Sequence, residues 1–572
     1  MGHAPDHLKQ KMKRILRVSL FALGIILTRL IYLQINLSDY FSIKSKKNFQ
    51  RTAKIQPLRG NILDCKNRML ATNRPVTDLY WQGTGNRRLS QAQKNILEQI
   101  TSIIDINDKE KLPATIRNAE RYHKQTPLFF DLTFHQISKL EELFPNNKNI
   151  TLQTRFARYY PYKSYASHIL GYLGDINIAM RGKMGLELLF QEQLQGEHGI
   201  VLKTINSLGK KLAEHEIKES LVGNNIQTTL DINLQHICEE VFPQNYSGTM
   251  IVMNPHDGAI KAIISRPSFD PSLFLAPISL KEWHAMQEKK PFINRAFNAT
   301  YPPGSIFKLI VVSAALEQGV IKPESTWNCE GSLVFGKRKY WCHRRYGHGE
   351  INTAQAVAKS CNILFYEIGK RMDIDQIAHY AGLFGLGEKT GIIFSEKKGI
   401  IPTRLWKEET IGERWWAGET LSIAIGQSFL TVTPIQIACM ISSIFTHSLT
   451  TPRMLKDEPI QKRPLNIKHE TLEFLQNSMA AVVTKGTGQR VSRVKDIKIY
   501  AKTSTAQVSS LKKRNIDNTH LEHGWFVAYF KYKEHKPLTI IILIEHAGSS
   551  RMPTMAAKHF LIRYKKYKDA LT

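Results

Sequence analysis

The chain has 572 residues, more than the roughly 250 to 300 at which a single hydrophobic core stops growing, so we expect at least two domains. Its apolar content of 42% is ordinary for a globular protein, and the absence of low-complexity tracts and short repeats excludes a disordered chain or a solenoid. The formal net charge of +30 favours an anionic partner. No nucleic-acid motif accompanies the charge, so we expect no nucleic-acid partner, and a basic solvated surface explains it equally well.

Residues 15–37 form a mostly apolar run of the length that crosses a bilayer. Arg17 and Arg29 interrupt it, so an amphipathic surface helix is the alternative. No small-residue cleavage site follows the run, which indicates an uncleaved, single-pass anchor. Basic residues precede it and place residues 1–14 in the cytoplasm, although others follow it and weaken the contrast: Lys9, Lys11, Lys13 and Arg14 before, and Lys44, Lys46, Lys47 and Arg51 after. The remainder of the chain is then expected on the periplasmic side of an inner membrane.

Residues 38–244 carry no catalytic group of side chains. Short strand patterns at 149–154 and 200–204 alternate with helical patterns such as 131–143, which indicates a mixed, non-catalytic domain. Arg59, Gly60 and Asp64 near its start suit a structured turn at the base of this domain, or simply a solvated turn with a glycine at positive φ.

The pattern changes at about residue 245. Two β-rich runs, 249–254 and 259–264, flank the turn sequence Pro-His-Asp-Gly at 255–258 and predict a hairpin. Three more strands are predicted at 497–506, 524–530 and 538–545. The approximately 230 residues between the two sets have mainly helical patterns. The fold class is therefore α+β, with an antiparallel five-stranded sheet packed with helices and a helical subdomain at residues 245–572.

Three short motifs lie in this second half: Ser305-Ile306-Phe307-Lys308, Ser360-Cys361-Asn362 and Lys502-Thr503-Ser504-Thr505. A serine nucleophile needs a base within hydrogen-bond reach, and residues three apart share a helix face, so Lys308 is expected beside Ser305. The two prolines and the glycine before Ser305 place it in the first helical turn, where free N–H groups stabilise an oxyanion. Together the motifs indicate an acyl-transferring serine site.

The three motifs resemble those of the class B penicillin-binding proteins, and the rest of the chain is most similar to the elongation-type branch, the penicillin-binding proteins 2. Further similarity spans nearly the whole chain: residues 58–64 (LRGNILD), 158–162 (RYYPY), 168–172 (HILGY), 185–187 (GLE), 294–297 (NRAF), 301–305 (YPPGS), 426–427 (GQ) and 433–436 (TPIQ). The resemblance implies the penicillin-binding transpeptidase fold, preceded by an elongated pedestal of the dimerisation type at residues 38–244. It implies a peptidoglycan D,D-transpeptidase that cross-links stem peptides during cell elongation and is acylated by β-lactams.

The family's mechanism assigns roles to the matching residues. Lys308 takes the proton of Ser305 as it attacks the carbonyl between two D-alanines, and Ser360 relays a proton to the leaving D-alanine. Asn362 holds a substrate amide, while Lys502 and Thr503 bind the terminal carboxylate. The amides of Ser305 and Thr505 form the oxyanion hole. No organic cofactor is implied.

Ser504 departs from the family pattern, which has glycine there. An inward-pointing side chain narrows the slot beside the strand, and altered β-lactam affinity is then expected rather than loss of activity. A side chain that faces away changes nothing.

Four residues around the second motif, Cys329, Cys342, His348 and Cys361, offer a complete tetrahedral zinc set. By resemblance, some penicillin-binding proteins 2 carry a zinc site in the corresponding region. In those proteins, acidic residues stand at some of the positions where this chain has cysteines. A disulfide, or buried free thiols, are the alternatives. Cys65, Cys238 and Cys439 are expected to be isolated.

Two other functions on the same scaffold stay open. A serine β-lactamase is normally small and soluble, whereas this chain is long and has an anchor. A membrane-bound β-lactam sensor is expected to have several membrane spans, whereas we find one. By resemblance, the expected partners are stem peptides, β-lactams, the membrane, a polytopic glycosyltransferase and other proteins of the elongation machinery.

Overall fold

The computed structural model describes residues 6–86, 88–104, 112–122, 124–174, 180–205, 211–276, 278–507 and 520–571. Of the predicted cytoplasmic segment 1–14, residues 1–5 therefore lie outside the described part. The chain forms two compact units, one of residues 1–59 and 195–223 and one of residues 60–194 and 224–572. The domain boundaries predicted from the sequence are not tested by this division and stay predictions.

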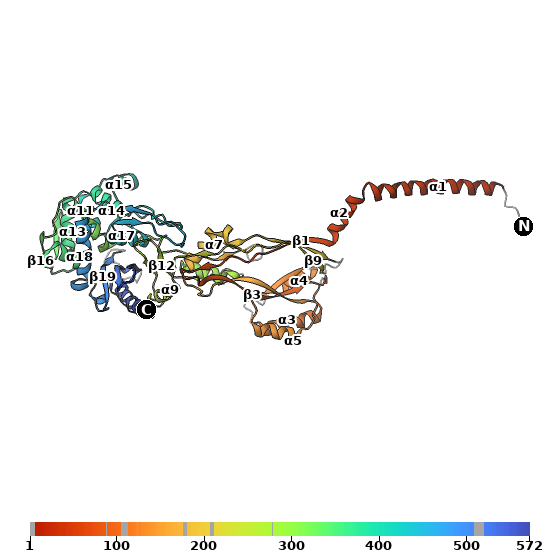
Figure 1. The fold of residues 1–572 in the computed structure, drawn as a ribbon, viewed down its shortest axis with the longest axis horizontal. Helices are drawn as coiled ribbons and strands as arrows, with labels where there is room; N and C mark the ends of the chain where they lie inside the picture. The colour runs from red at the N-terminus through yellow and green to blue at the C-terminus, as the bar shows by residue number, and fades with distance from the viewer. Residues whose placement is uncertain are drawn as a thin grey trace. The chain divides into compact units, whose positions relative to one another are not determined.

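The first unit contains the apolar N-terminal helix and a small sheet. Helix α1 (Asp6–Ile35) is continuous (Figure 1), and its segment Gln10–Ile35 is long and apolar enough to cross a membrane, with a mean hydropathy of 1.9. Helix α2 (Ser38–Phe49) follows, and strand β1 (Gln50–Ile55) pairs with β8 (Gly199–Ile205), which pairs with β9 (Lys211–Lys218). The predicted strand at 200–204 is thus confirmed.

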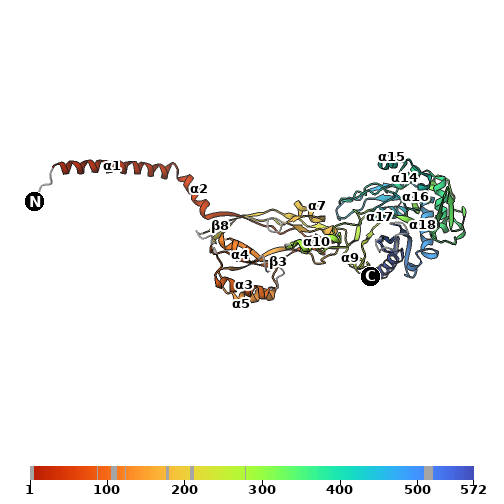
Figure 2. The ribbon, with the colours of Figure 1, turned by 180° about the vertical axis from the view of Figure 1, so that it is seen from behind.

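The first part of the second unit is organised around the long strand β3 (Met69–Gln82), which pairs antiparallel with both β4 and β5. Helices α3 and α5 lie side by side in both views (Figures 1 and 2) and pack on the β3 side chain of Leu79 through a small apolar core. The other elements of this part are short. The bounds are β2 Ile62–Leu63, α3 Gln91–Ile103, α4 Leu112–Arg121, β4 Gln125–Phe129, α5 Phe134–Leu143, β5 Ile150–Tyr159, α6 Ser167–Leu170, β6 Leu173–Gly174, β7 Arg181–Gly182, α7 Gly185–Leu189, α8 Gln191–Gln195 and β10 Ile226–Gln227.

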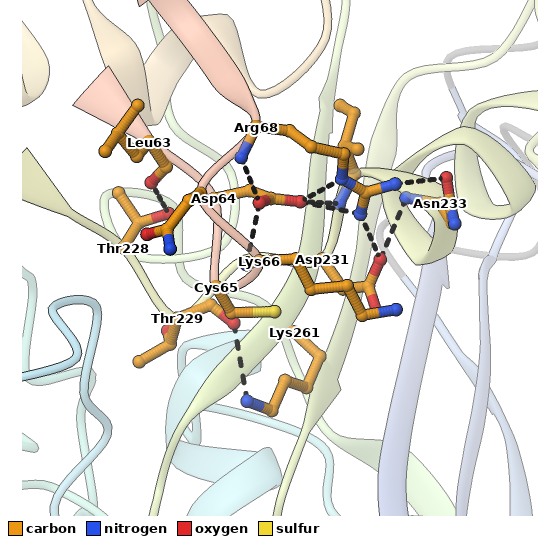
Figure 3. Close-up of polar contacts among 12 residues, drawn as sticks. Leu63, Asp64, Cys65, Lys66, Arg68, Thr228, Thr229, Asp231, Asn233 and Lys261 are labelled. Carbon is orange, nitrogen blue, oxygen red and sulfur yellow. Dashed lines mark hydrogen bonds and ion pairs between the residues drawn. The ribbon is translucent and has the colours of Figure 1, made fainter. Parts of the chain in front are cut away.

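A buried polar cluster joins the turn after β2 to the start of helix α9 (Ile232–Val241), as Figure 3 shows. Asp64 is fully buried and accepts hydrogen bonds from the backbone N–H groups of Lys66 and Arg68. The guanidinium of Arg68 lies between the Asp64 carboxylate, at 2.6 Å, and that of Asp231, at 2.9 Å. The solvated-turn alternative is therefore wrong for Asp64, because its charge is paired inside the protein.

The segment predicted at residues 245–572 contains the expected five-stranded antiparallel sheet, in the order β12-β11-β21-β20-β19. Alternate side chains of its strands face two separate cores. Met250 and Phe526 pack with helices α9 and α19, whereas Ile251 and Val527 pack with helices α11 and α17 on the other face. The bounds are β11 Gly248–Met253, β12 Ile260–Arg266, β19 Ile497–Ala506, β20 His523–Tyr532, β21 Leu538–Ile544 and α19 Arg551–Asp569.

Between β12 and β19 the described part of the chain is mainly helical, as predicted, and it also forms three small strand pairs: β13 with β16, β14 with β15, and β17 with β18. These pairs were not predicted. The bounds are η1 Pro271–Leu275, α10 Leu280–Glu288, η2 Gly304–Ile306, α11 Lys308–Glu317, β13 Thr326–Cys329, β14 Ser332–Phe335, β15 Arg338–Trp341, β16 Gly349–Asn352, α12 Thr353–Ala358, α13 Asn362–Arg371, α14 Ile374–Leu383, α15 Arg404–Ile411, α16 Ala417–Ala424, α17 Pro434–Thr446, β17 Ser448–Thr450, β18 Lys462–Pro464, α18 His469–Lys485 and η3 Gln489–Val491.

Candidate active site

Ser305 lies in the short 3₁₀ turn η2, directly before helix α11, which begins at Lys308. Gly304 has φ +52°, a conformation that glycine adopts without strain. Its N–H donates to the carbonyl of Gly426, which fixes the turn against the segment after α16. The predicted first-turn position of Ser305 is therefore a 3₁₀ turn rather than α-helix.

Lys308 is fully buried, and its ammonium group reaches the second motif. Nζ lies 2.7 Å from Asn362 Oδ1, 2.9 Å from the Ser360 carbonyl and 3.4 Å from Ser360 Oγ. Both Lys308 and Ser305 are described, and no hydrogen bond joins them, so the expected contact between the two is not present in this state of the protein. Burial lowers the pKa of Lys308 to about 8, so part of this amine is neutral near physiological pH.

The second motif lies in the connection between α12 and α13, as expected. Ser360 is buried and has φ +55°, which is uncommon for a residue with a side chain and is often found at functional sites. Lys502 Nζ donates to Ser360 Oγ at 3.1 Å, so Ser360 lies between two lysines. Burial, with the charge of Lys308, lowers the pKa of Lys502.

The third motif lies on the edge strand β19, as predicted. Thr503 Oγ1 is 2.6 Å from Thr487 Oγ1, and Thr505 Oγ1 accepts from the N–H of Ser550. The Ser504 hydroxyl is buried without a hydrogen-bond partner. It points toward Gly304, because a Cβ placed on that glycine would lie 2.4 Å from Ser504 Oγ. The alternative in which Ser504 faces away from the site is thus wrong.

Residues of all three motifs line one cleft of about 770 Å³. Its walls include Ser305, Ser360, Asn362, Thr503, Ser504 and Thr505, from all three motifs. The second motif touches β19 through Ser360 and the hairpin β14–β15 through Asn362, whose Nδ2 donates to the Trp341 carbonyl at 3.0 Å. A serine hydroxyl and a strand edge in one cleft, with two buried amines that contact its Ser360, have the composition that acyl transfer requires.

The four predicted metal-binding residues also come together. The ligand atoms of Cys329, Cys342, His348 and Cys361 all lie within 4.8 Å of one another. Cys329 Sγ is 3.5 Å and Cys342 Sγ 3.6 Å from His348 Nδ1, and the sulfurs of Cys342 and Cys361 are 4.0 Å apart. The thiolate and imidazole ligands of a tetrahedral zinc ion lie about 3.5 to 3.8 Å apart, so these three separations are close to those of a zinc site. All six cysteines are free, and the sulfur separation is far above the roughly 2.05 Å of a disulfide.

Sequence reasoning missed the contribution of the hairpin β14–β15 to the cleft. Arg338, Lys339 and Trp341 line the cleft, together with Arg345 beyond the second strand. The signal was the dense run of basic residues between Cys329 and His348. This run lacks the alternation that identifies a strand, so its position could not be inferred.

Comparison with known proteins agrees with this geometry. The model of the penicillin binding protein transpeptidase domain matches residues 248–561, and that of the penicillin-binding protein dimerisation domain matches residues 54–228. The chain is 29% identical to the peptidoglycan D,D-transpeptidase MrdA of Acinetobacter baumannii, over 96% of this chain and 88% of that protein.

Two solved structures are similar over most of the chain. The structure of penicillin-binding protein 2 in complex with MreC from Helicobacter pylori has a TM-score of 0.76 at 28% identity, covering 91% of this chain and 99% of that one. A structure from a peptidoglycan synthase complex that coordinates polymerization and crosslinking has a TM-score of 0.74 at 29% identity, covering 97% and 98%. With the transpeptidase match extending over more than half of its length, the chain belongs to the penicillin-binding proteins, and within class B it is of the penicillin-binding protein 2 type.

Proposed function

We propose that this protein is a peptidoglycan D,D-transpeptidase of cell elongation and that Ser305 is its nucleophile. The observation that carries the proposal is that the buried amines of Lys308 and Lys502 meet at Ser360, which lines the same cleft as Ser305 and Asn362. The similarity to proteins named peptidoglycan D,D-transpeptidase over more than nine-tenths of the chain supports the same reaction.

In the first half-reaction, Ser305 Oγ attacks the carbonyl carbon between two D-alanines of a stem peptide, and its proton passes to the neutral amine of Lys308. For this step Nζ must leave its present contacts with Asn362 and Ser360 and move toward Ser305. The tetrahedral intermediate collapses, the peptide bond breaks, and the leaving D-alanine amine receives a proton through Ser360. An ester between Ser305 and the donor peptide remains.

In the second half-reaction, an amine of a neighbouring stem peptide attacks the ester, forms the cross-linking amide and returns the proton to Ser305. Two N–H groups, those of Ser305 and Thr505, would stabilise the oxyanion in both halves. Lys502 and Thr503 would bind the terminal carboxylate, and that negative charge offsets the cost of keeping Lys502 protonated while buried. A β-lactam would acylate Ser305 and stall, because its leaving group stays attached.

We further propose that the Cys/His cluster holds a structural zinc ion. Cys342 follows the hairpin β14–β15 directly, and Cys361 lies between Ser360 and Asn362. A metal at this position would fasten the hairpin to the catalytic loop from behind and supply rigidity rather than a chemical step.

We also propose that α1 anchors the protein in the inner membrane with the catalytic half in the periplasm. The apolar helix Gln10–Ile35 supports the anchor, and the basic residues before it support the orientation. The relative from Helicobacter pylori is in complex with MreC, and another similar chain is from a peptidoglycan synthase complex. A polytopic glycosyltransferase and other elongation proteins are the partners we expect for this chain.

Intact-protein mass after incubation with benzylpenicillin tests the proposal, with the wild type and Ser305→Ala in parallel. We expect a stable adduct of one penicillin on the wild type alone. Rapid drug hydrolysis by the wild type without a stable adduct would instead identify a β-lactamase. An adduct on both proteins, or neither an adduct nor hydrolysis with the wild type, would remove Ser305 as the nucleophile. A stable adduct without transfer to an added amine-bearing peptide would favour a sensor.

A further inference from the structure

A basic hairpin forms one wall of the catalytic cleft. Residues 332–345, which form the hairpin β14–β15 with its turn and the segment after it, contain five Lys and Arg side chains. Three of them line the cleft: Arg338, Lys339 and Arg345. Glu522 is the one carboxylate among the described residues of the lining. All three cations are exposed. In the described part of the chain, none of the three has a carboxylate within ion-pairing distance of 4.0 Å. Among the residues that the structure describes, this positive charge in the cleft is therefore left without a neutralising carboxylate.

This charge is held on a fixed support. The Lys339 ammonium lies 4.5 Å and the Arg345 guanidinium 4.3 Å from the centre of the Trp341 ring, so both stack on one indole. The carbonyl of Trp341 accepts from Asn362 Nδ2 at 3.0 Å and from Tyr366 OH at 3.3 Å. The tryptophan that orients the two cations is thus bonded to the side chain proposed to hold the substrate.

We propose that Arg338, Lys339 and Arg345 form a carboxylate-binding subsite that selects acidic peptide substrates in the transpeptidase reaction. The inference rests on the proposed function, since it concerns the peptides that enter the same cleft. Lys502 and Thr503 are assigned to the terminal carboxylate, on the β19 side of the catalytic loop. Lys502 contacts the catalytic loop through Ser360, whereas the hairpin β14–β15 contacts it through Asn362. The cations of the hairpin therefore contact parts of the peptides that lie away from the scissile bond.

The chemistry favours carboxylates over neutral groups. Arginine presents paired N–H donors that match a carboxylate, and lysine adds a point charge. Both are exposed, so each contact is screened by water and salt, and three cations together are needed for a strong preference. The carboxylate belongs either to the donor peptide, upstream of its D-alanines, or to the peptide that supplies the amine.

The test uses the full chain in detergent and the triple variant Arg338→Gln, Lys339→Gln, Arg345→Gln. The donors are synthetic peptides ending in D-alanyl-D-alanine, in pairs that differ only in whether a carboxyl group one or two residues upstream is free or amidated. The acceptors are amine-bearing peptides in matched free and amidated forms. The control variant is Lys337→Gln, which removes a charge from the same hairpin at a position outside the cleft lining.

We expect the wild type and Lys337→Gln to prefer the free-carboxyl form of the donor or of the acceptor by about tenfold in kcat/KM. The triple variant should lose that preference while it uses the amidated peptides at the wild-type rate. Retention of the preference in the triple variant, or its absence from the wild type for both donor and acceptor, would overturn the subsite.

Benzylpenicillin acylation separates this result from a failure of the proposed function. Acylation should proceed at the same rate in the triple variant. Lys502 and Ser305 bind and react with the drug, which has no peptide residues upstream of its reactive group. If the triple variant is not acylated, Arg345→Lys and Arg338→Lys, which keep the charges, are compared with the single glutamine variants. Loss of the preference in the glutamine variants alone supports the subsite, and loss in both sets contradicts a role for charge.

Discussion

At the scale of single residues, two buried lysines determine the charge around Ser360. Lys308 and Lys502 both contact Ser360, and each charge opposes the other. Burial lowers the pKa of Lys308 to about 8, so a modest change in its surroundings releases its proton. A substrate carboxylate beside Lys502 would stabilise the positive charge there.

Gly304 is the residue whose substitution should disturb the nucleophile most directly without removing a catalytic group. In Gly304→Ala, the added Cβ would lie 2.4 Å from Ser504 Oγ, and alanine is strained at φ +52°. The turn that carries Ser305 must shift, and we expect the benzylpenicillin acylation rate to fall by about ten- to a hundredfold. Stopped-flow measurement of the acylation rate tests this.

Two further variants separate the clash from backbone strain. Gly319→Ala has the same kind of strain, at φ +68°, with no atom within 4 Å of the added Cβ, and should leave the rate unchanged. Adding Ser504→Gly to Gly304→Ala removes the clashing hydroxyl and should recover part of the rate. If the double variant is as slow as Gly304→Ala, Ser504 is not what the new methyl group meets.

The sequence predicted the identity of the motif residues but not their contacts. Spacing placed Lys308 on the face of Ser305, because residues three apart share a helix face. Its long side chain instead reaches the Ser360 carbonyl and the side-chain amide of Asn362, more than fifty residues away. Likewise, the direction of Ser504 depends on its pairing in β19 and on the approach of η2, which are tertiary features. Local pattern carries no information on either.

At the scale of structural elements, a bound metal ion should stabilise the contact between the end of the hairpin β14–β15, at Cys342, and the start of α13, at Cys361. If zinc binds, Cys342→Ser should reduce the zinc content of the purified protein, lower its melting temperature and slow benzylpenicillin acylation, because the catalytic loop loses its fastening. Elemental mass spectrometry and thermal unfolding measure the first two.

Cys65→Ser is the matched control, since Cys65 lies far along the chain from the cluster and is free. It should retain the wild-type zinc content and melting temperature. A Cys342→Ser protein with unchanged metal content and unchanged melting temperature would show that the cluster is only a set of buried thiols.

Within the second unit, the short helix α6 makes a pH-dependent contact with the segment that follows helix α10. The buried ring of His168 donates from Nε2 to the carbonyl of Pro291 at 2.6 Å and packs against Phe269. Burial, together with the charges of Arg295 and Arg266, lowers the pKa of His168 to about 4 from the ordinary value of 6.5. The folded protein therefore keeps this ring neutral at a pH where the unfolded chain protonates it.

Because the folded pKa is depressed, the contribution of His168 to stability is complete above pH 6.5 and is lost as the pH falls toward 4. The loss at pH 4 is on the order of 3 kcal/mol. In His168→Gln the amide still donates but does not titrate, so the melting temperature should fall less between pH 6.5 and 4 than in the wild type. Parallel pH profiles of the two proteins would contradict this account.

The sequence predicts helices and strands correctly where the hydrophobic pattern is periodic. It fails at the ends of helices and at short strand pairs, because single contacts determine these. Helix α5 was predicted from residue 131 and begins at Phe134, because Thr133 caps it through a capping box with Gln136. The five main strands were predicted because their buried side chains are continuous or alternate. The pair β14–β15 was missed, since four-residue strands with mixed side chains have no distinct period.

For the molecule as a whole, the charges beside α1 should decide on which side of the membrane the catalytic cleft lies. Alkaline phosphatase fused to the C-terminus is active only outside the cytoplasm, so the full chain should give high phosphatase activity in cells. Replacing the four basic residues before the span by serine should lower that activity, because cytoplasmic flanks retain Lys and Arg: Lys9, Lys11, Lys13 and Arg14. The matched replacement after the span should raise it or leave it unchanged: Lys44, Lys46, Lys47 and Arg51. If a C-terminal green fluorescent protein is fluorescent and the phosphatase fusion is inactive, the orientation is reversed, and a cytoplasmic cleft would have no access to the cell wall.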